Sequence, residues 1–294
     1  MTTTSAVYAW SPDGEVRRLS PPAGFYTEPV VHPDGSRAAF WGGAFGTPGV
    51  WQVDLASGRI ARLTATASGS WRPSYSLHGE RMVHTSDRFT QTRTDDMAIV
   101  AGRLLIARRG EGDGAYFDAD LRSHIFVNAL DGRGVTPITS GDVRDDEPAL
   151  SPDGARIAFL SDRGDGPALW IVDVDAGSVP EPLLQQAVTL PRWSTDGERI
   201  YFQSRSGGVS WVAISGGPSQ AVTVDGPGAL GSLSVDPGGE HLLAHAGDAG
   251  AEAIWELPLA GGTARELRPP GFDNALHPSR ARDGVIVFAS IVEL

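Results

Sequence analysis

A short sequence pattern recurs six times along the chain and constrains its fold more than any other feature. It is clearest at 147–154, Glu-Pro-Ala-Leu-Ser-Pro-Asp-Gly, which an apolar stretch and the segment Leu169-Trp170-Ile171-Val172-Asp173 follow. The other copies begin at Glu28, Arg72, Pro191, Ser234 and Asp273. Because one repeat buries its apolar faces only against its neighbours, this period predicts a repeat architecture.

One aromatic residue per repeat gives a second measure of the period. The aromatics stand at Tyr8, Trp51, Phe126, Trp170, Trp211 and Trp255, at intervals of 43, 75, 44, 41 and 44 residues. The long interval indicates a single insertion of about 32 residues, and the pattern closes across the chain ends with an interval of 47. This closure favours a ring over an open solenoid.

Each repeat has the sequence of four short strands separated by turns. In the third repeat the strands are predicted at 149–151, 156–160, 169–173 and 181–184, and Pro-Asp-Gly at 152–154 supplies the first turn. Four-stranded sheets repeated every 40 to 45 residues are typical of β-propellers. We therefore predict an all-β, six-bladed β-propeller of antiparallel four-stranded blades, with residues 1–294 as one domain.

The two ends of the chain are predicted to complete the last blade together. Its inner strands are expected at 273–278 and 284–290, while 7–10 and 15–19 have the sequence of the third and fourth strands. Such a closure leaves no open sheet edge in the ring.

The repeat at 151–173 resembles that of the TolB-like propeller family, which occurs in the periplasmic protein TolB and in the propeller domains of prolyl oligopeptidase-type enzymes. The matching segments are Ser-Pro-Asp-Gly, Ile-Ala-Phe, Ser-Asp-Arg-Gly and Leu-Trp-Ile-Val-Asp. The resemblance implies the fold and says little about activity, because these residues form turns and core. TolB also has an export signal and an N-terminal domain, and we expect neither of them in this chain. The chain has no Gly-x-Ser-x-Gly pentapeptide either, so we do not expect the serine triad of the peptidases.

Composition narrows the function classes. The net charge of −12 argues against binding to nucleic acid, since such binding neutralises phosphates. The chain has no cysteine and no lysine, which excludes thiolate and Schiff-base chemistry. No apolar run is long enough to span a membrane, and the first residues lack the features of a signal peptide, so we expect a cytoplasmic protein.

The candidate site is a ring at the mouth of the central channel. Alignment of the innermost strands places one residue per blade there: Glu28, Arg72, Glu147, Leu190, Ser232 and Asp273. A second tier is expected beneath them: Val30, Ser74, Ala149, Arg192, Ser234 and Ala275. The candidate acid/base residues are Glu28, Glu147 and Asp273, and the candidate binding residues are Arg72, Arg192 and Trp71. The alternative is a solvated ring in which the arginines only neutralise the acids.

No cofactor or metal site is predicted, although Ca²⁺ at the mouth remains an alternative because carboxylates are its preferred ligands. The acidic stretch 141–147 is interpreted as a solvated loop. The histidines are expected on different blades and faces, with His32, His78 and His277 in turns of the Pro-Asp-Gly type, His84 in the core, and His241 and His245 in the fifth blade.

The insertion, residues 89–122 in blade two, is expected on the mouth face. Asp95 and Asp96 suggest an N-terminal cap for a helix from Met97 to Arg109, which Gly110 would end. An insertion of this length suggests a lid or binding element, with a tolerated surface loop as the alternative.

These observations favour a propeller that binds a peptide, protein or small molecule at the channel mouth. The alternative is a lyase, isomerase or hydrolase that uses the ring carboxylates as acid and base and Arg72 and Arg192 as anion clamps. The sequence does not decide whether the protein is an enzyme.

Overall fold

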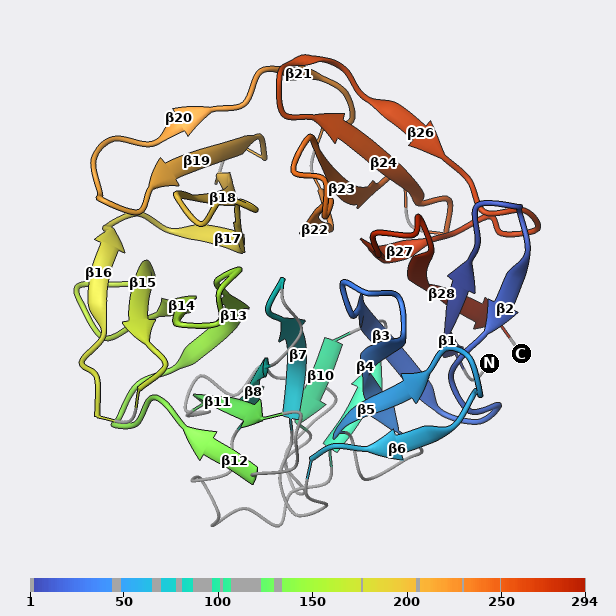
Figure 1. Ribbon diagram of the computed structural model, residues 1–294, viewed down its shortest axis with the longest axis horizontal. Helices are drawn as coiled ribbons and strands as arrows, with labels where there is room; N and C mark the ends of the chain where they lie inside the picture. Colours follow the sequence, from blue (N-terminus) through green and yellow to red (C-terminus); the bar gives the residue numbers. More distant parts are fainter. Residues whose placement is uncertain are drawn as a thin grey trace, which may run out of the picture.

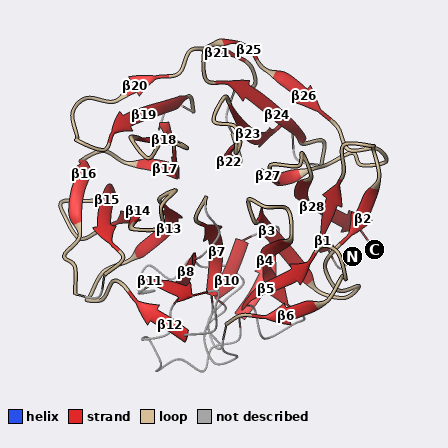
Figure 2. Ribbon diagram, viewed as in Figure 1, coloured by secondary structure: helices blue, strands red, loops and turns tan. Residues whose placement is uncertain are grey.

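The computed structural model describes the following residues: 3–43, 49–64, 70–77, 81–86, 97–100, 103–106, 123–129, 134–175, 177–204, 207–228, 230–248 and 250–293. Within these ranges the regular elements are all strands, as Figure 2 shows. No helix in this part of the chain is long and apolar enough to cross a membrane. The strands surround a common axis as a β-propeller (Figure 1).

Four antiparallel sheets of four strands stand as separate blades, each with its first strand at the axis (Figure 1). The first of them contains β7 (Ser70–Tyr75), β8 (Arg81–Ser86), β11 (His124–Ala129) and β12 (Gly134–Pro137). The next contains β13 (Asp145–Leu150), β14 (Arg156–Ser161), β15 (Ala168–Asp173) and β16 (Glu181–Leu184). The third contains β17 (Val188–Trp193), β18 (Arg199–Ser204), β19 (Val209–Ala213) and β20 (Gln220–Ala221). The fourth contains β22 (Ser232–Val235), β23 (His241–Ala246), β24 (Ala253–Pro258) and β26 (Arg265–Leu267).

The remaining expected blades, the first and the last, form one eight-stranded sheet. Its strands are β27 (Leu276–Arg280), β28 (Ile286–Glu293), β1 (Thr3–Trp10), β2 (Val16–Arg18), β3 (Phe25–Val31), β4 (Arg37–Gly43), β5 (Gly49–Asp54) and β6 (Ile60–Arg62). The two halves meet at one parallel pairing between Ser5 and Phe25, where the Ser5 hydroxyl also bonds to the backbone N–H and C=O of Tyr26. The prediction of six separate four-stranded sheets is therefore wrong: four are separate, and two are joined by this bridge.

The predicted closure by both chain ends is confirmed. β1 pairs with β28 over its full length, from Thr3 opposite Glu293 to Trp10 opposite Ile286, and β2 pairs with the other side of β1. At the outer rim β21 (Val224–Asp225) and β25 (Gly262–Thr263) make a short parallel pair.

The core lies between adjacent sheets. Trp170 on β15 stands opposite Phe159 on β14, and both pack in one cluster with Val83 and Ile125 from the preceding sheet. The other repeat aromatics hold the same third-strand position, since Trp51 stands opposite Phe40, and Tyr8 opposite Phe288. The aromatic period of the sequence therefore marks the residues that pack one blade against the next.

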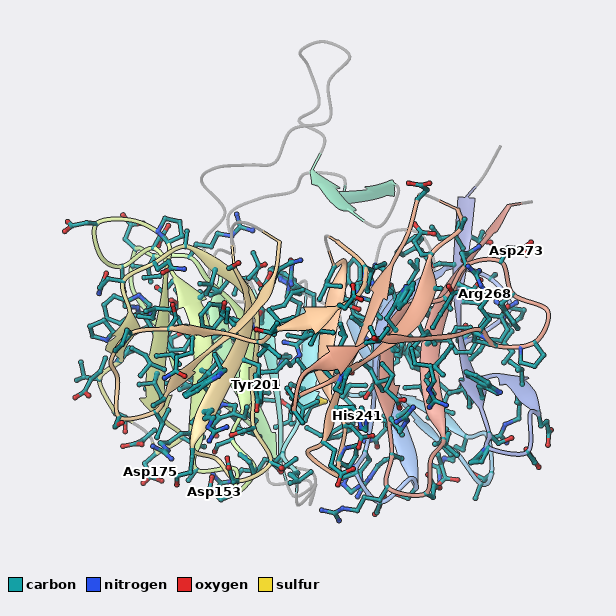
Figure 3. The ribbon with its side chains drawn as sticks, turned by 90° about the horizontal axis from the view of Figure 1, so that it is seen from above. Asp153, Asp175, Tyr201, His241, Arg268 and Asp273 are labelled. Carbon is teal, nitrogen blue, oxygen red and sulfur yellow. The ribbon has the colours of Figure 1, made fainter. Side chains whose placement is uncertain are left out.

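The Ser-Pro-Asp-Gly pattern forms the tight turn between the first and second strands. The Gly154 N–H donates to the Ser151 carbonyl (2.9 Å), and the Asp153 carboxylate accepts from the Ser151 hydroxyl (2.6 Å). Gly154 has φ of 71°, which glycine adopts without strain. Figure 3 places Asp153 at one edge of the disc and Asp273 at the opposite edge, and we call these the turn face and the loop face.

The predicted helix from Met97 to Arg109 is wrong. Met97–Val100 and Arg103–Ile106 form two antiparallel strands, β9 and β10, which Figure 3 shows beyond the loop face. Ile99, Val100 and Ile106 are β-branched and Gly102 is a poor helix former, so local preference favours strands. The rest of the insertion 89–122 lies outside the described residues.

Candidate functional site

The innermost strands carry an irregularity that repeats around the axis. In five of them the pairing register shifts by one residue, and a residue followed by proline forms the bulge. Proline has no N–H for the ladder, so a bulge is where an inner strand accommodates it. The residues before these prolines all have φ between 50° and 57°: Glu28, Arg72, Glu147, Leu190 and His277. We call this set the bulge ring.

A left-handed backbone at a residue with a side chain costs about 1–3 kcal/mol, and such strain concentrates at functional sites. Each of the five residues of the bulge ring carries this backbone strain, and all five surround one axis. Among the described residues, these five are the only non-glycine positions with positive φ.

The bulge ring lines an axial cavity of about 460 Å³. The cavity wall comes from β3, β7, β13, β17, β22 and β27, which contact one another in a closed ring. Its lining extends from Thr189 and Gly231, toward the loop face, to Pro33, Pro152 and Pro237 in the turns of the opposite face. The volume lies in the range of small-molecule sites.

Glu28, Arg72 and Glu147 converge, as the sequence predicted. The Glu28 carboxylate accepts the backbone N–H of Arg72 (3.2 Å), and Arg72 Nη1 pairs with Glu147 Oε1 (2.9 Å). Glu147 in turn accepts the backbone N–H of Leu190. The two carboxylates thus each hold the strained backbone of the next blade.

Asp146 supports this arrangement from behind. Its Oδ1 atom accepts from the Trp71 indole N–H (3.2 Å) and the Thr85 hydroxyl (3.3 Å), and it pairs with Arg72 Nε (3.2 Å). Trp71, a predicted binding residue, is not among the residues that line the cavity. Its indole N–H instead helps to hold the Asp146 carboxylate in place.

Arg192 lies in the cavity wall and differs from the other arginines there. Arg72 pairs with Asp146 and Glu147, and Arg280 pairs with Asp236 (3.2 Å) and Glu256 (2.7 Å). Arg192 donates instead to two backbone carbonyls, Leu233 O through Nε (2.6 Å) and Pro191 O through Nη1 (2.7 Å). It makes no ion pair with a carboxylate in the part of the chain that the structure describes.

In the six-residue ring predicted at the channel mouth, the place assigned to Asp273 is taken by His277. Asp273 is exposed at the rim of the loop face (Figure 3) and does not line the cavity, whereas His277 precedes Pro278 in the bulge of β27 and does. The predicted placement of Asp273 in the ring, and of His277 in a turn, is therefore wrong. The turn is formed by 281–284, where the Gly284 N–H donates to the Ala281 carbonyl (3.0 Å). In the second tier Ser279 takes the place predicted for Ala275.

The inner strand β22 is the exception to the bulge pattern. It pairs without a register shift, with Ser232 opposite His245. His245 Nδ1 contacts the Ser232 hydroxyl (2.7 Å) and accepts the backbone N–H of His277 (3.1 Å). A Cβ atom on Gly231 would lie 2.0 Å from His245 Nε2, so this imidazole requires the glycine beside it. No sequence pattern marks His245, so its role could not be predicted.

The Ser232–His245 pair has the composition of a nucleophile and a base. Since a backbone N–H can only donate, Nδ1 is an acceptor and the imidazole is neutral. Burial and the nearby His277 lower the pKa of His245 to about 3. An imidazole of such low basicity is a poor general base, so this pair is an anchor for the His277 backbone.

The charged groups in the cavity and their burial shift the pKa values of their neighbours. Burial raises the pKa of the Glu28 carboxyl, although Arg72 opposes this effect. Burial, Arg72 and Arg192 lower the pKa of His277 to about 4, which keeps its ring neutral near pH 7. Burial also lowers the pKa of the Arg192 guanidinium, and the neighbouring Arg72 adds to this effect.

No group of three metal-binding side chains occurs among the described residues. The carboxylates at the end of the acidic stretch pair with arginines: Asp145 with Arg163 (2.6 Å), and Asp146 with Arg72 and Arg144. Ca²⁺ at the mouth stays an alternative that the sequence left open.

Comparisons with known proteins agree with this architecture. No protein-family model matches the chain. The uncharacterized peptidase YuxL of Bacillus subtilis is 38% identical over 80 residues, which is 26% of this chain and only 12% of that protein's length.

Solved structures match over a larger part of the chain. A protein assigned as TolB from Agrobacterium tumefaciens has a TM-score of 0.71 at 15% identity, with full coverage of both chains. An oligogalacturonate lyase from Vibrio parahaemolyticus has a TM-score of 0.55 at 14% identity, over 95% of this chain and 81% of that one. At these identities the likeness establishes the fold. The chain is therefore a β-propeller protein with the TolB-like fold.

Proposed function

We propose that the protein binds a small polar molecule in its axial cavity. The observation that carries this proposal is the bulge ring, which keeps five strained residues around one cavity of about 460 Å³. Strain at a single position has many causes, but its repetition at the lining of one cavity favours a binding role.

The lining suits a polar ligand of modest size. Ser74, Ser194, Thr195 and Ser234 line the cavity together with the prolines of the bulges, and the hydroxyls of Ser194 and Ser234 donate to Asp196 and to the Pro278 carbonyl. A peptide or protein at the mouth, which the sequence also left open, would have to reach this lining with a narrow segment. We also propose that the two halves of the eight-stranded sheet act as two blades, so that six inner strands share the site.

Ligand-observed saturation-transfer NMR tests this function with uronic acids, aldonic acids, dipeptides and neutral sugars as probes. The matched variants are Ser74→Phe, which places a ring in the cavity, and Ser215→Phe on an exposed turn. We expect at least one class of probe to bind the wild-type protein and Ser215→Phe, and to lose binding in Ser74→Phe. If no probe shows binding that Ser74→Phe abolishes, the proposal is wrong.

A second candidate is an enzyme with Glu28 as its acid/base group. The raised pKa of Glu28, its place in the cavity and its backbone anchor at Arg72 favour this candidate, as does the fold shared with an oligogalacturonate lyase. Its test is cleavage of oligogalacturonate by the wild-type protein and by Glu28→Gln. Cleavage that Glu28→Gln retains would exclude Glu28 from the reaction, and no cleavage would exclude this substrate class.

A further inference from the structure

Among the described residues, Arg192 is the cavity arginine with no carboxylate at salt-bridge distance, although Glu147 and Glu28 act on its charge from farther away. Arg192 is half-buried in the cavity wall, where its guanidinium loses part of its hydration without gaining a paired carboxylate. Backbone carbonyls of Pro191 and Leu233 take two of its donor atoms. Its Nη2 atom has no hydrogen bond to the described residues.

His277 lies in the same cavity, and its backbone position is fixed. Its N–H is held by His245, its φ is 51°, and the residue lines the cavity. No described residue bonds to its ring nitrogens. A neutral imidazole still has one N–H donor for an anion.

The charged groups around His277 come from several blades. Arg72 on β7 and Arg192 on β17 lie near enough to lower its pKa, and the neutral His245 on β23 packs edge-on against its ring at 4.9 Å between centroids. Glu28 and Glu147 influence Arg192 without pairing with it. Their oxygens are already engaged by the backbone of Arg72 and Leu190.

We propose that Arg192 and His277 form an anion subsite in the cavity and that it takes the carboxylate of a small organic acid. This inference rests on the proposed binding function and names its ligand class. The guanidinium would supply charge-assisted hydrogen bonds and the imidazole a neutral donor. A single guanidinium with a neutral donor matches a monoanion, and the serine and threonine residues of the lining match a polar body such as that of a sugar acid.

The subsite is tested with acetate alone, which needs no knowledge of the physiological ligand. Acetate is titrated at constant ionic strength while NMR follows the ring C–H signals of His277, which a His277→Gln variant assigns. Acetamide is the neutral isostere and phosphate the alternative anion. The variants are Arg192→Gln, Arg192→Lys and the control Arg199→Gln, which changes an exposed arginine in the same sheet.

We expect a saturable shift of the His277 signals with acetate in the wild-type protein and in Arg199→Gln, and none with acetamide. Arg192→Gln should weaken acetate about tenfold or more, since one charge-assisted hydrogen bond contributes that much, and Arg192→Lys should retain part of the affinity. Bound acetate should also raise the pKa of His277 from about 4.

Three results would overturn the inference: no saturation with acetate, unchanged affinity in Arg192→Gln, or saturation with phosphate but not acetate. These results can be distinguished from the outcome of the binding experiment with Ser74→Phe. Neutral sugars that bind in a manner blocked by Ser74→Phe, together with no effect of acetate, would retain the binding function and reject the anion subsite.

Discussion

The imidazole of His245 accepts the backbone N–H of His277 over 3.1 Å and thereby does for one blade what a carboxylate does for two others. Glu28 holds the backbone of Arg72, and Glu147 holds that of Leu190. Acceptors from alternate blades thus fix the strained residues of the blades between them. The ion pair between Arg72 and Glu147 joins Glu28, Arg72, Glu147 and Leu190 of the bulge ring into one connected chain, while His245 holds His277 separately.

The His245 acceptor should be replaceable by an amide but not by a methyl group. We expect His245→Ala to lower the free energy of unfolding by about 2–4 kcal/mol, because it leaves a buried N–H and a hydroxyl without a partner and creates a cavity. In His245→Asn the amide oxygen lies near the former Nδ1 position, so most of this loss should be avoided. Urea unfolding of both variants measures the difference, and equal losses would show that the acceptor does not matter.

Glu147 should contribute to folding, because its side chain is 12% exposed and holds both Arg72 and the Leu190 backbone. We expect Glu147→Gln to cost about 1–2 kcal/mol, since the amide still accepts the N–H but loses the ion pair, and Glu147→Ala to cost about 2–4 kcal/mol. Denaturant midpoints check the order. A loss in Glu147→Ala no larger than in Glu147→Gln would contradict the role of the backbone bond.

Stability should fall at mildly acidic pH because His84 is buried in its neutral form. Burial lowers the pKa of His84 from 6.5 to about 4, so its contribution is complete above pH 6.5 and is lost as the pH falls toward 4. The neutral His84 contributes about 3 kcal/mol to the free energy of unfolding when this contribution is complete. His245 and His277 act in the same direction.

The replacement His84→Phe tests this origin, since phenylalanine holds the equivalent place opposite the third-strand aromatic at Phe40 and Phe159. The variant should lose less stability than the wild-type protein between pH 7 and pH 4.5 in urea unfolding. An identical loss would assign the acid sensitivity to other groups.

Removal of residues 1–19 should unfold or oligomerise the protein. The deletion takes away β1 and β2 and leaves β28 with an unpaired edge of eight residues. Size-exclusion chromatography with thermal unfolding provides the measurement. A monomer with an unchanged melting temperature would contradict the structural role of the closure.

The sequence predicted the features that follow from local chemistry. Turn residues and apolar strands defined the repeat, and alignment of the innermost strands located Glu28, Arg72 and Glu147. It failed for the last repeat because Leu276-His277-Pro278 looks like Val31-His32-Pro33, whereas the turn there is Ala281-Arg282-Asp283-Gly284. The apparent match shifted the alignment by four residues and selected Asp273 instead of His277.

The role of His245 and the isolation of Arg192 could not be predicted for a different reason. Both depend on which partners are absent: β22 has no bulge, and Arg192 has no carboxylate within the described residues. Such properties belong to the assembled ring and leave no mark on any single repeat. The helix predicted from Met97 does not form because the β-branched residues Ile99, Val100 and Ile106 favour strands, and capping residues at the two ends do not outweigh this preference.

The pairing of β1 with β28 also has a consequence for synthesis. Thr3 meets Glu293, so β1 cannot complete its pairing until β28, much later in the chain, has been synthesised. At about 5–20 residues per second, this wait is on the order of tens of seconds. During that time one edge of β1 has no partner within the chain, and the synthesis of β28 removes a strand edge that could otherwise pair with another molecule.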